Sequence, residues 1–450
     1  HNETLKMAAS VSGTYDLSTS GGTTAMRTAN CYVINAPGQY SLPLVYGNAI
    51  KDGGTNASAY TSQSSGTYVL KTFVNHLDAA ITDPYIYNNA GCTPLDAVLV
   101  WQDEENLVTN VRLSSDKHSL TFDVPQATIK QGNAIVAVRD TDSRIMWSWH
   151  IWVTDYELGS DVRTVTNYQG IAYKMMPVNI GWCDAETTTY DARSVKVRFT
   201  QAETGAMQVI TLTQASHSVV NFGNQPYFQF GRKDPMLAGI RNASGSTVDK
   251  GCYSDGYAFD KSGTGKVAIG VSIQHPHIFY NYGSSSIYDW CATSYSNLWS
   301  GDNTVTTAND NAVVKTIYDP SPVGYHLPSS NAFTYNGSNV FGSSYFGSRF
   351  NSPYTSTTDF TDNFGWEFYC NKMTGEGSYD TAGGTIFFPA SGYRSYSAGT
   401  VNNVGSLGYF WSAVPYSTSY GRSLSFRSSY IYPLSINYRS DGFVVRPVQE

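Results

Sequence analysis

The chain has 450 residues, a formal net charge of −7 and a charged fraction of only 14 %, well below the roughly 25 % of ordinary globular domains. A mildly acidic chain without a basic stripe argues against a nucleic-acid partner. No apolar run approaches the roughly 20 residues that a membrane-spanning helix needs, so we expect no membrane span.

Tyrosine is unusually abundant, with 34 copies in an aromatic fraction of 14 %. Its stiff, amphipathic ring suits strand surfaces and contact faces. The six cysteines are widely scattered and lack a C-x-x-C pair, so zinc-ribbon spacing is absent. Scattered cysteines are more often buried thiols than disulfides, and the sequence leaves both open.

The first 27 residues are small and polar and predict a tail or linker. The first four residues do not resemble a natural start, and we expect a processed or trimmed chain. Residues 28–157 predict an Ig-like β-sandwich, because apolar residues alternate in short runs between turn residues. The clearest of these runs are 96–103, 118–125, 133–140 and 144–156.

Residues 158–220 predict a β-hairpin module or a linker segment. Within them, 196–215 alternates like two strands around the turn Glu203-Thr204-Gly205. From 221 the chain becomes rich in aromatic and turn residues, with short strands expected at 384–394, 408–414, 423–429 and 442–448. A helix is expected to begin near Ser330. The predicted class is mostly β with some α+β.

Residues with catalytic or metal-binding chemistry are sparse. His275 and His277 could share one face of a strand and bind a metal. Such a pair more often consists of two loop histidines that bind no metal. Asp302 and its oxygen-rich neighbours could hold a hard cation, although Asx residues that close a turn are about three times as common an explanation. We expect no catalytic residue, no metal and no cofactor.

Several segments resemble known surface proteins. GRKDP (231–235), KTIYDPSPVGYHLPSSNAFT (315–334) and FPASGYRSYSAGTVNNVGSLGYFWSAV (388–414) resemble the C-terminal module of many Bacteroidetes surface proteins, the Fibrobacter-type major paralogous domain. NCYVINAPGQYSLPLVYGNAI (30–50) resembles the Ig-like part of fimbrillin-family proteins. The resemblance covers most of 28–450. It implies a C-type-lectin-like or formylglycine-generating-enzyme-like, ligand-binding module over 221–450.

The resemblance also suggests where a ligand would bind. Relatives of this fold include enzymes, lectins and the variable proteins of diversity-generating retroelements, in which a C-terminal segment forms the binding face. In those proteins adenine randomisation of Asn-type codons cannot produce Lys, Glu, Gln, Met or Trp, and residues 416–441 contain none of these. Thirteen of these 26 residues are Ser or Tyr, as in antibody paratopes. The alternative is a Ser/Tyr-rich meander that faces solvent and binds nothing.

Strand alternation divides this segment into two faces. It predicts that Leu424, Phe426, Leu434, Ile436, Phe443 and Val445 point into the core. The candidate ligand-binding residues are Tyr416, Tyr420, Arg422, Ser423, Ser425, Arg427, Tyr430, Tyr432, Ser435, Tyr438, Ser440 and Asp441.

These observations predict a non-catalytic ligand-binding or adhesion protein at the cell surface, associated with the outer membrane at a fimbrial tip or on a stalk. Its ligand would be a protein or a glycan, and other pilus subunits are further candidate partners. One alternative is an enzyme of the formylglycine-generating-like fold or a carbohydrate-active enzyme. The other is a structural pilus subunit that exchanges strands at a sheet edge.

Overall fold

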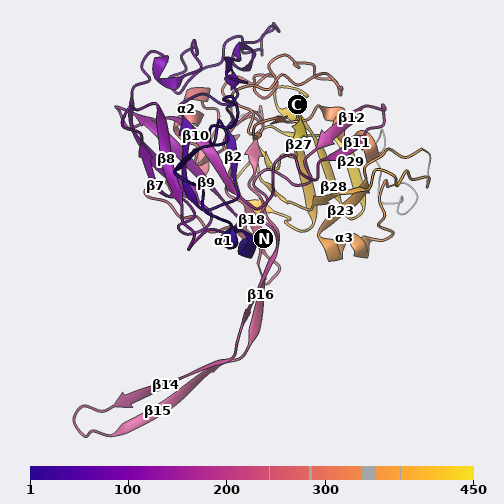
Figure 1. Cartoon of the computed structure of the whole chain (residues 1–450). Helices are drawn as coiled ribbons and strands as arrows, with labels where there is room; N and C mark the ends of the chain where they lie inside the picture. The colour runs from indigo at the N-terminus through magenta and orange to yellow at the C-terminus, as the bar shows by residue number, and fades with distance from the viewer. Residues whose placement is uncertain (243, 283–285, 337–349, 375–376) are drawn as a thin grey trace.

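The computed structural model describes residues 1–242, 244–282, 286–336, 350–374 and 377–450. This part of the chain is mostly β, as the sequence predicts. Figure 1 shows two lobes side by side, a sandwich lobe and a C-terminal lobe, with a long ribbon projecting from them. Among the residues described, no helix is long and apolar enough to cross a bilayer.

The sandwich lobe contains two four-stranded sheets, with strand orders β1-β3-β8-β7 and β2-β10-β9-β6. The pairs β1/β3 and β2/β10 are parallel, and the other pairs are antiparallel. The strands are β1 (Thr14–Asp16), β2 (Cys31–Ile34), β3 (Gly38–Pro43), β6 (Pro94–Gln102), β7 (Thr109–Leu113), β8 (Ser119–Val124), β9 (Gly132–Asp140) and β10 (Ile145–Val153). A long excursion between β3 and β6 contains β4 (Ile50–Lys51), β5 (Gly54–Thr55), η1 (Ala57–Ala59) and η2 (Ile86–Asn88).

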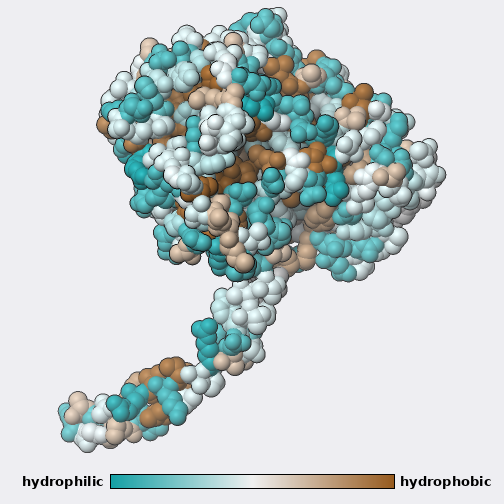
Figure 2. All heavy atoms as spheres, in the orientation of Figure 1, coloured by the Kyte–Doolittle hydropathy of each residue, from teal (hydrophilic) through white to brown (hydrophobic). Residues whose placement is uncertain are grey.

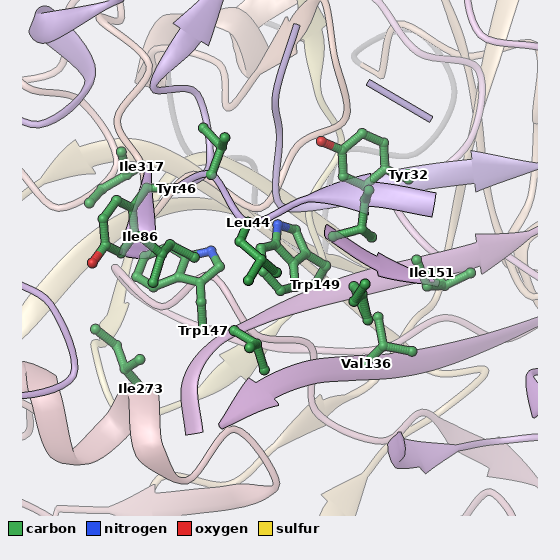
Figure 3. Close-up of a cluster of buried hydrophobic side chains, with 14 of the residues drawn as sticks. Tyr32, Leu44, Tyr46, Ile86, Val136, Trp147, Trp149, Ile151, Ile273 and Ile317 are labelled. Atoms are coloured by element: carbon green, nitrogen blue, oxygen red, sulfur yellow. The ribbon is translucent and has the colours of Figure 1, made fainter. Parts of the chain in front are cut away.

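Strand β10 lies inside its sheet between β2 and β9, and all nine of its residues are buried. Both faces of its sheet are covered, which explains why β10 has a nearly continuous apolar sequence rather than strict alternation. Trp147 and Trp149 pack against the excursion residues Leu44 and Ile86 in the core on one side (Figure 3). On the other side the C-terminal lobe closes over the sheet, where Leu237 joins a small core with residues of β6, β9 and β10.

Residues 1–27 belong to the sandwich lobe and do not form the expected tail. They contain α1 (Asn2–Met7) and β1, and β1 pairs with β3. Leu5 is fully buried. The prediction failed because a few apolar anchors hold this segment in an otherwise polar stretch, and composition does not reveal them.

The predicted segment 158–220 divides between the C-terminal lobe and the ribbon. Strands β11 (Arg163–Thr166) and β12 (Ala172–Met175) join the C-terminal lobe in the sheet β11-β12-β31-β22. The ribbon, which we call the arm, consists of β13 (Glu186–Tyr190), β14 (Arg193–Thr200), β15 (Met207–Gln214) and β16 (His217–Asn221). Strand β13 pairs with β16, and β14 pairs with β15 across the expected turn, where Gly205 has a φ of 69°.

The C-terminal lobe surrounds a three-stranded antiparallel sheet, β27-β28-β29. Its helices are α3 (Thr357–Asn363) and the 3-10 helix η3 (Ser330–Asn336), which begins at the predicted Ser330. Helix α2 (Ile269–Gln274) instead packs against β10, and its residues Ile269 and Ile273 join the core of the sandwich lobe (Figure 1). The remaining strands are β17 (Phe228–Gln229), β18 (Gly239–Arg241), β19 (Thr247–Asp249), β20 (Asp260–Thr264), β21 (Ile278–Asn281), β22 (Tyr325–His326), β23 (Gly365–Tyr369), β24 (Thr385–Pro389), β25 (Tyr393–Arg394), β26 (Val401–Asn402), β27 (Leu407–Pro415), β28 (Tyr420–Arg427), β29 (Tyr430–Tyr438), β30 (Gly442–Phe443) and β31 (Val448–Gln449).

Buried polar contacts join the two lobes. The Lys233 ammonium lies 2.6 Å from the Asp234 carboxylate and donates to the carbonyl of Ser148 on β10 at 3.0 Å. The Ser148 hydroxyl donates to the same carboxylate at 2.6 Å. Burial lowers the pKa of Lys233, and Asp234 opposes that shift. The ion pair itself lies within the C-terminal lobe, and the hydrogen bonds with Ser148 cross to β10. Because leaving buried polar groups without these partners is costly, the contact favours a fixed arrangement of the lobes.

All six cysteines are free thiols, five buried and Cys252 exposed. The buried-thiol interpretation is therefore confirmed for five of them, and the disulfide alternative is wrong.

Buried His150 on β10 makes stability depend on pH. Its Nε2 lies 2.9 Å from the Asn133 side-chain oxygen, and burial lowers its pKa to about 3. Between about pH 6.5, the ordinary pKa, and pH 3, the unfolded chain binds a proton that the folded chain does not. The free energy of unfolding should therefore fall as the pH falls through this window, by about 1.4 kcal/mol per pH unit for this group.

Denaturant unfolding of the wild type and His150→Gln, measured from pH 7 to pH 4, tests this expectation. The difference in unfolding free energy between them should shrink as the pH falls. The same substitution at exposed His118 should leave the pH dependence unchanged. A constant difference between wild type and His150→Gln would contradict the prediction.

Candidate ligand-binding surface

The central sheet of the C-terminal lobe is covered on both faces along most of β27 and β28. Leu424 and Phe426 pack with Phe410 and Ile431 in one core. Trp411 on the opposite face packs in a second core, and its indole N–H donates to the Phe228 carbonyl at 2.9 Å. The predicted core positions Leu424, Phe426, Phe443 and Val445 are confirmed as buried.

Two predicted core positions are wrong, because Leu434 is only half-buried and Ile436 is 41 % exposed. Ser423 pairs with Ser435, whereas Ser425 pairs with Tyr432, so β29 contains a β-bulge with one extra residue between these pairs. Beyond the bulge Ile436 pairs with Arg422 and therefore lies on the same face of the sheet as Leu424. Its side chain is exposed because β29 is the outermost strand of the sheet and this end of that face is not covered.

Four of the predicted binding residues are unavailable to a ligand. Ser423, Ser425, Ser440 and Asp441 are buried, with exposed fractions of 5 % or less. The predicted outward face assumed that one side of the sheet meets solvent, and here both sides are covered. Ser435 is half-buried, and its hydroxyl accepts a hydrogen bond from the Asn437 side chain at 3.0 Å.

The other predicted residues lie at opposite ends of β28. Arg427, Tyr430 and Tyr432 gather at the β28–β29 turn, where the Arg427 guanidinium lies 4.6 Å from the centre of the Tyr430 ring. Tyr420 lies at the other end of β28, seven residues away, or about 23 Å along an extended strand. The predicted single face is therefore two separate surfaces.

The surface at the Tyr420 end is a network of tyrosine rings. The Tyr438 ring is at its centre, with ring centroids at 4.2 Å to Tyr288, 4.4 Å to Tyr396 and 5.0 Å to Tyr420. Tyr282 contacts Tyr288 and Tyr396, and Tyr416 meets Tyr420 edge-on at 6.4 Å. We call these six residues, Tyr282, Tyr288, Tyr396, Tyr416, Tyr420 and Tyr438, the tyrosine face.

The rings of the tyrosine face are partly exposed: Tyr416 is 40 % exposed, and the other five are half-buried. Hydrogen bonding with Tyr420 and desolvation raise the pKa of Tyr438 to about 12. The Tyr438 hydroxyl is therefore neutral at physiological pH and can both donate and accept hydrogen bonds.

Arg422 fixes the edge of this surface. Its guanidinium donates from Nε and Nη2 to the Thr306 carbonyl at 3.0 and 2.9 Å. It also lies 5.0 Å from the centre of the Tyr416 ring. Arg422 thus ties the strand to a neighbouring loop and supports Tyr416, while its second terminal nitrogen makes no hydrogen bond within the part of the chain that the structure describes.

A buried segment behind the rings connects the strands and loops that bear them. We call Arg439, Ser440 and Asp441 the frame. The Arg439 amide donates to the Ser419 carbonyl at 3.0 Å, next to Tyr420. The Ser440 amide donates to the Tyr288 carbonyl at 3.2 Å.

The acidic group of the frame holds the third chain segment. The Asp441 carboxylate accepts a hydrogen bond of 2.7 Å from the Tyr396 amide. Burial raises the pKa of Asp441 well above its ordinary value, while the amides of Tyr396 and Tyr438 oppose the shift. The frame thus anchors every segment that meets at Tyr438.

Arg439 is balanced by a second buried acid. Its guanidinium lies 3.3 Å from the Asp289 carboxylate, and both side chains are 1 % exposed or less. It also lies 4.8 Å from the centre of the Phe230 ring. Burial raises the pKa of Asp289, and Arg439 opposes that shift. Asp289 follows Tyr288 directly, so this pair secures the same loop as the Ser440 amide.

The residues considered for metal binding, His275, His277 and Asp302, are half-buried. Desolvation lowers the pKa of both His275 and His277, whose ring centroids lie 6.0 Å apart. The Asp302 carboxylate accepts hydrogen bonds from the amides of Gln63 and Ser64 and closes that loop. Within the described ranges, one group of three potential ligands lies close together, His1, Asp155 and Asp184.

Sequence reasoning found three members of the tyrosine face, Tyr416, Tyr420 and Tyr438, and missed Tyr282, Tyr288 and Tyr396. The missed residues come from loops far away in sequence. The one sequence signal that could have indicated these residues is the high tyrosine content of 282–296 and 393–396. These segments show no strand alternation, so the sequence does not predict which way the side chains point.

Comparison with known proteins gives one match. Residues 354–448 match a family model described as "Domain of unknown function (DUF8237)". No curated protein and no solved structure matches the chain. The matched segment contains the central sheet and the frame, whereas Tyr282 and Tyr288 lie outside it. The surface therefore combines the matched segment with a loop that precedes it.

Substitution of Asp441 tests whether the frame contains a buried acid. Because the pKa of this group is raised in the folded state, its contribution to stability is fully present below about pH 3.8 and is lost as the pH rises toward the folded-state pKa. Asp441→Asn keeps an oxygen acceptor for the Tyr396 amide and removes the titration. The variant should gain stability relative to wild type as the pH rises from 4 to 8.

Thermal unfolding at several pH values measures this trend. Asp441→Ala should cost about 1–3 kcal/mol, because it leaves a buried amide without its partner. The change Asp191→Asn, on the exposed arm, is the control for charge removal alone. A difference between wild type and Asp441→Asn that does not change with pH would refute the buried-acid account.

Proposed function

We propose that this protein is a non-catalytic ligand-binding or adhesion protein and that its ligand, a protein or a glycan, binds to the tyrosine face. The observation that supports this most strongly is the network of six partly exposed rings from separate chain segments, all anchored to one buried frame. Large aromatic side chains that remain partly exposed and closely grouped are typical of interaction surfaces.

The arrangement suits binding because the rings are already positioned. A tyrosine has few rotatable bonds, and each ring here contacts at least one other ring of the face, so binding orders little that is still mobile. Three neighbours cover Tyr438. A ligand would therefore meet hydroxyl groups and the outer rings, such as Tyr416, rather than the faces of the central ring.

The strand order of the first lobe supports the Ig-like part of the proposal. The sheets β3-β8-β7 and β2-β10-β9-β6 correspond to the B-E-D and G-F-C arrangements of immunoglobulin sandwiches when β3 is taken as strand B and β10 as strand G. For the second lobe, the resemblance of 221–450 supports a C-type-lectin-like or formylglycine-generating-enzyme-like module. The absence of the five excluded residue types from 416–441 supports a diversified segment. We place the protein at the cell surface, associated with the outer membrane.

A binding screen with matched variants tests the proposal. The full chain is applied to an array of glycans and purified secreted proteins, and the affinity for each positive probe is then measured. Tyr416→Ala combined with Tyr420→Ala should weaken binding by about tenfold or more, since each buried aromatic contact contributes about 1–2 kcal/mol.

The control is Tyr168→Ala, which removes a tyrosine that is 52 % exposed on a turn outside the tyrosine face. It should bind as wild type does. Tyr430→Ala with Tyr432→Ala reports on the other predicted surface. Full binding by the Tyr416 and Tyr420 double variant would reject the tyrosine face, and loss of binding in the Tyr430 and Tyr432 variant would move the site to the β28–β29 turn.

A further inference from the structure

The distal half of the arm exposes an apolar face that nothing in the described chain covers. Opposed residues of an antiparallel pair share a face, so Val195 with Leu212, Val197 with Ile210, and Phe199 lie together on one side of β14 and β15. The side chains of Val195, Phe199, Ile210 and Leu212 are between 46 % and 57 % exposed. Figure 2 shows these apolar residues gathered on the far part of the arm, away from both lobes.

Such a ribbon needs a partner. An isolated two-stranded ribbon is marginally stable in water, and a third strand or a covering surface normally stabilises it. Its two outer edges also leave backbone donors and acceptors open to pairing. The arm should therefore be most stable when a further strand lies beside it and its apolar face is covered.

The sandwich lobe offers a complementary feature, a groove of about 780 Å³ at its open side. The groove lies between β6 and β7, each the outermost strand of its sheet. We call it the edge groove. It is lined by Ala97, Val98, Leu99, Gln102, Glu105, Asn106, Val108, Thr109, Asn110, Val111, Cys252, Tyr253, Ser254 and Asp255.

The free side of β6 already accepts a short pairing within this groove. Gln102 and Tyr253 exchange two backbone hydrogen bonds of 2.9 Å. Toward Ala97 the described chain places no further strand on this side of β6. An added strand could therefore continue the sheet from that pair, with the apolar residues of β6 and β7 beside it.

The charges of the two features are complementary. Strands β14 and β15 contain Arg193, Lys196 and Arg198 and no acidic residue. The edge groove is lined by Glu105 and Asp255 and by no Lys or Arg. Lys196 and Arg198 lie on the face of the ribbon opposite the apolar one, so the ribbon could place apolar side chains in the groove and its cations near the acidic rim.

We propose that the distal ribbon of one copy of this chain inserts into the edge groove of a second copy and adds a strand to β6. The arm points away from its own lobes (Figure 1), which favours a second copy over the same chain. Because each chain has one arm and one groove, the contact is head-to-tail. It builds an open chain of subunits or closes into a ring.

Sedimentation velocity of the full chain over a range of concentrations tests this assembly. Wild type should form species larger than the 49.2 kDa chain. An arm variant (Val195→Ser, Phe199→Ser, Leu212→Ser) and a groove variant (Val98→Arg, Val111→Arg) should each remain monomeric. Mixed in equal amounts, they should form a species of two chains and nothing larger, because only one intact arm and one intact groove meet.

A charge exchange supplies a second test on exposed residues, which should not disturb folding. Lys196→Glu with Arg198→Glu, or Glu105→Lys with Asp255→Lys, should each weaken association by about tenfold. All four changes in one chain should restore it. Circular dichroism with thermal unfolding checks that each variant is folded.

Three outcomes would overturn the proposal. First, the wild type could be monomeric at every concentration. An arm that folds onto its own chain would give this result. The groove variant could associate as wild type does, which would indicate pairing between arms. The four-fold charge exchange could fail to restore association while both two-fold variants are folded.

Discussion

The buried segment Arg439 to Asp441 determines where the tyrosine rings lie, because its hydrogen bonds reach three separate parts of the chain. Moving ionisable groups out of water is costly, and this segment does so twice, with Arg439 beside Asp289 and with Asp441, whose pKa is raised by burial, beside the Tyr396 amide. Buried polar groups of this kind specify one arrangement when their partners are present. The surface residues in front can then differ in identity while the positions from which they project stay fixed.

The two proposals concern different parts of the molecule and could act together. The tyrosine face lies at one end of the central sheet of the C-terminal lobe, whereas the edge groove follows β6 and β7 of the sandwich lobe and the arm projects away from both lobes. Buried contacts of Lys233 and Asp234 with β10 hold the lobes together. An assembly of head-to-tail copies would therefore present many tyrosine faces in a regular arrangement, and weak individual binding would be strengthened by multivalency.

Sequence patterns predicted the local features of this surface and failed where contacts between distant segments decide the outcome. Alternation correctly placed Leu424 and Phe426 in the core. It failed at Leu434 and Ile436, because the core does not extend under this end of the edge strand β29. It also assigned Ser440 and Asp441 to the surface, since a polar residue that is buried by its hydrogen bonds looks the same in sequence as an exposed one. Tyr282, Tyr288 and Tyr396 could not have been found, because only the folded chain brings their loops to Tyr438.

The most direct test of this account is a saturation library at Tyr416, Tyr420, Arg439 and Asp441, displayed on cells and sorted separately for protease resistance and for binding to a probe from the array. The account predicts that most substitutions at Tyr416 and Tyr420 keep the protein folded and weaken binding. It predicts that most substitutions at Arg439 and Asp441 lower protease resistance and binding together. If variants at Tyr416 and Tyr420 bind as wild type does, or if Arg439 and Asp441 accept most residues without loss of protease resistance, the division between a binding face and a supporting frame is wrong.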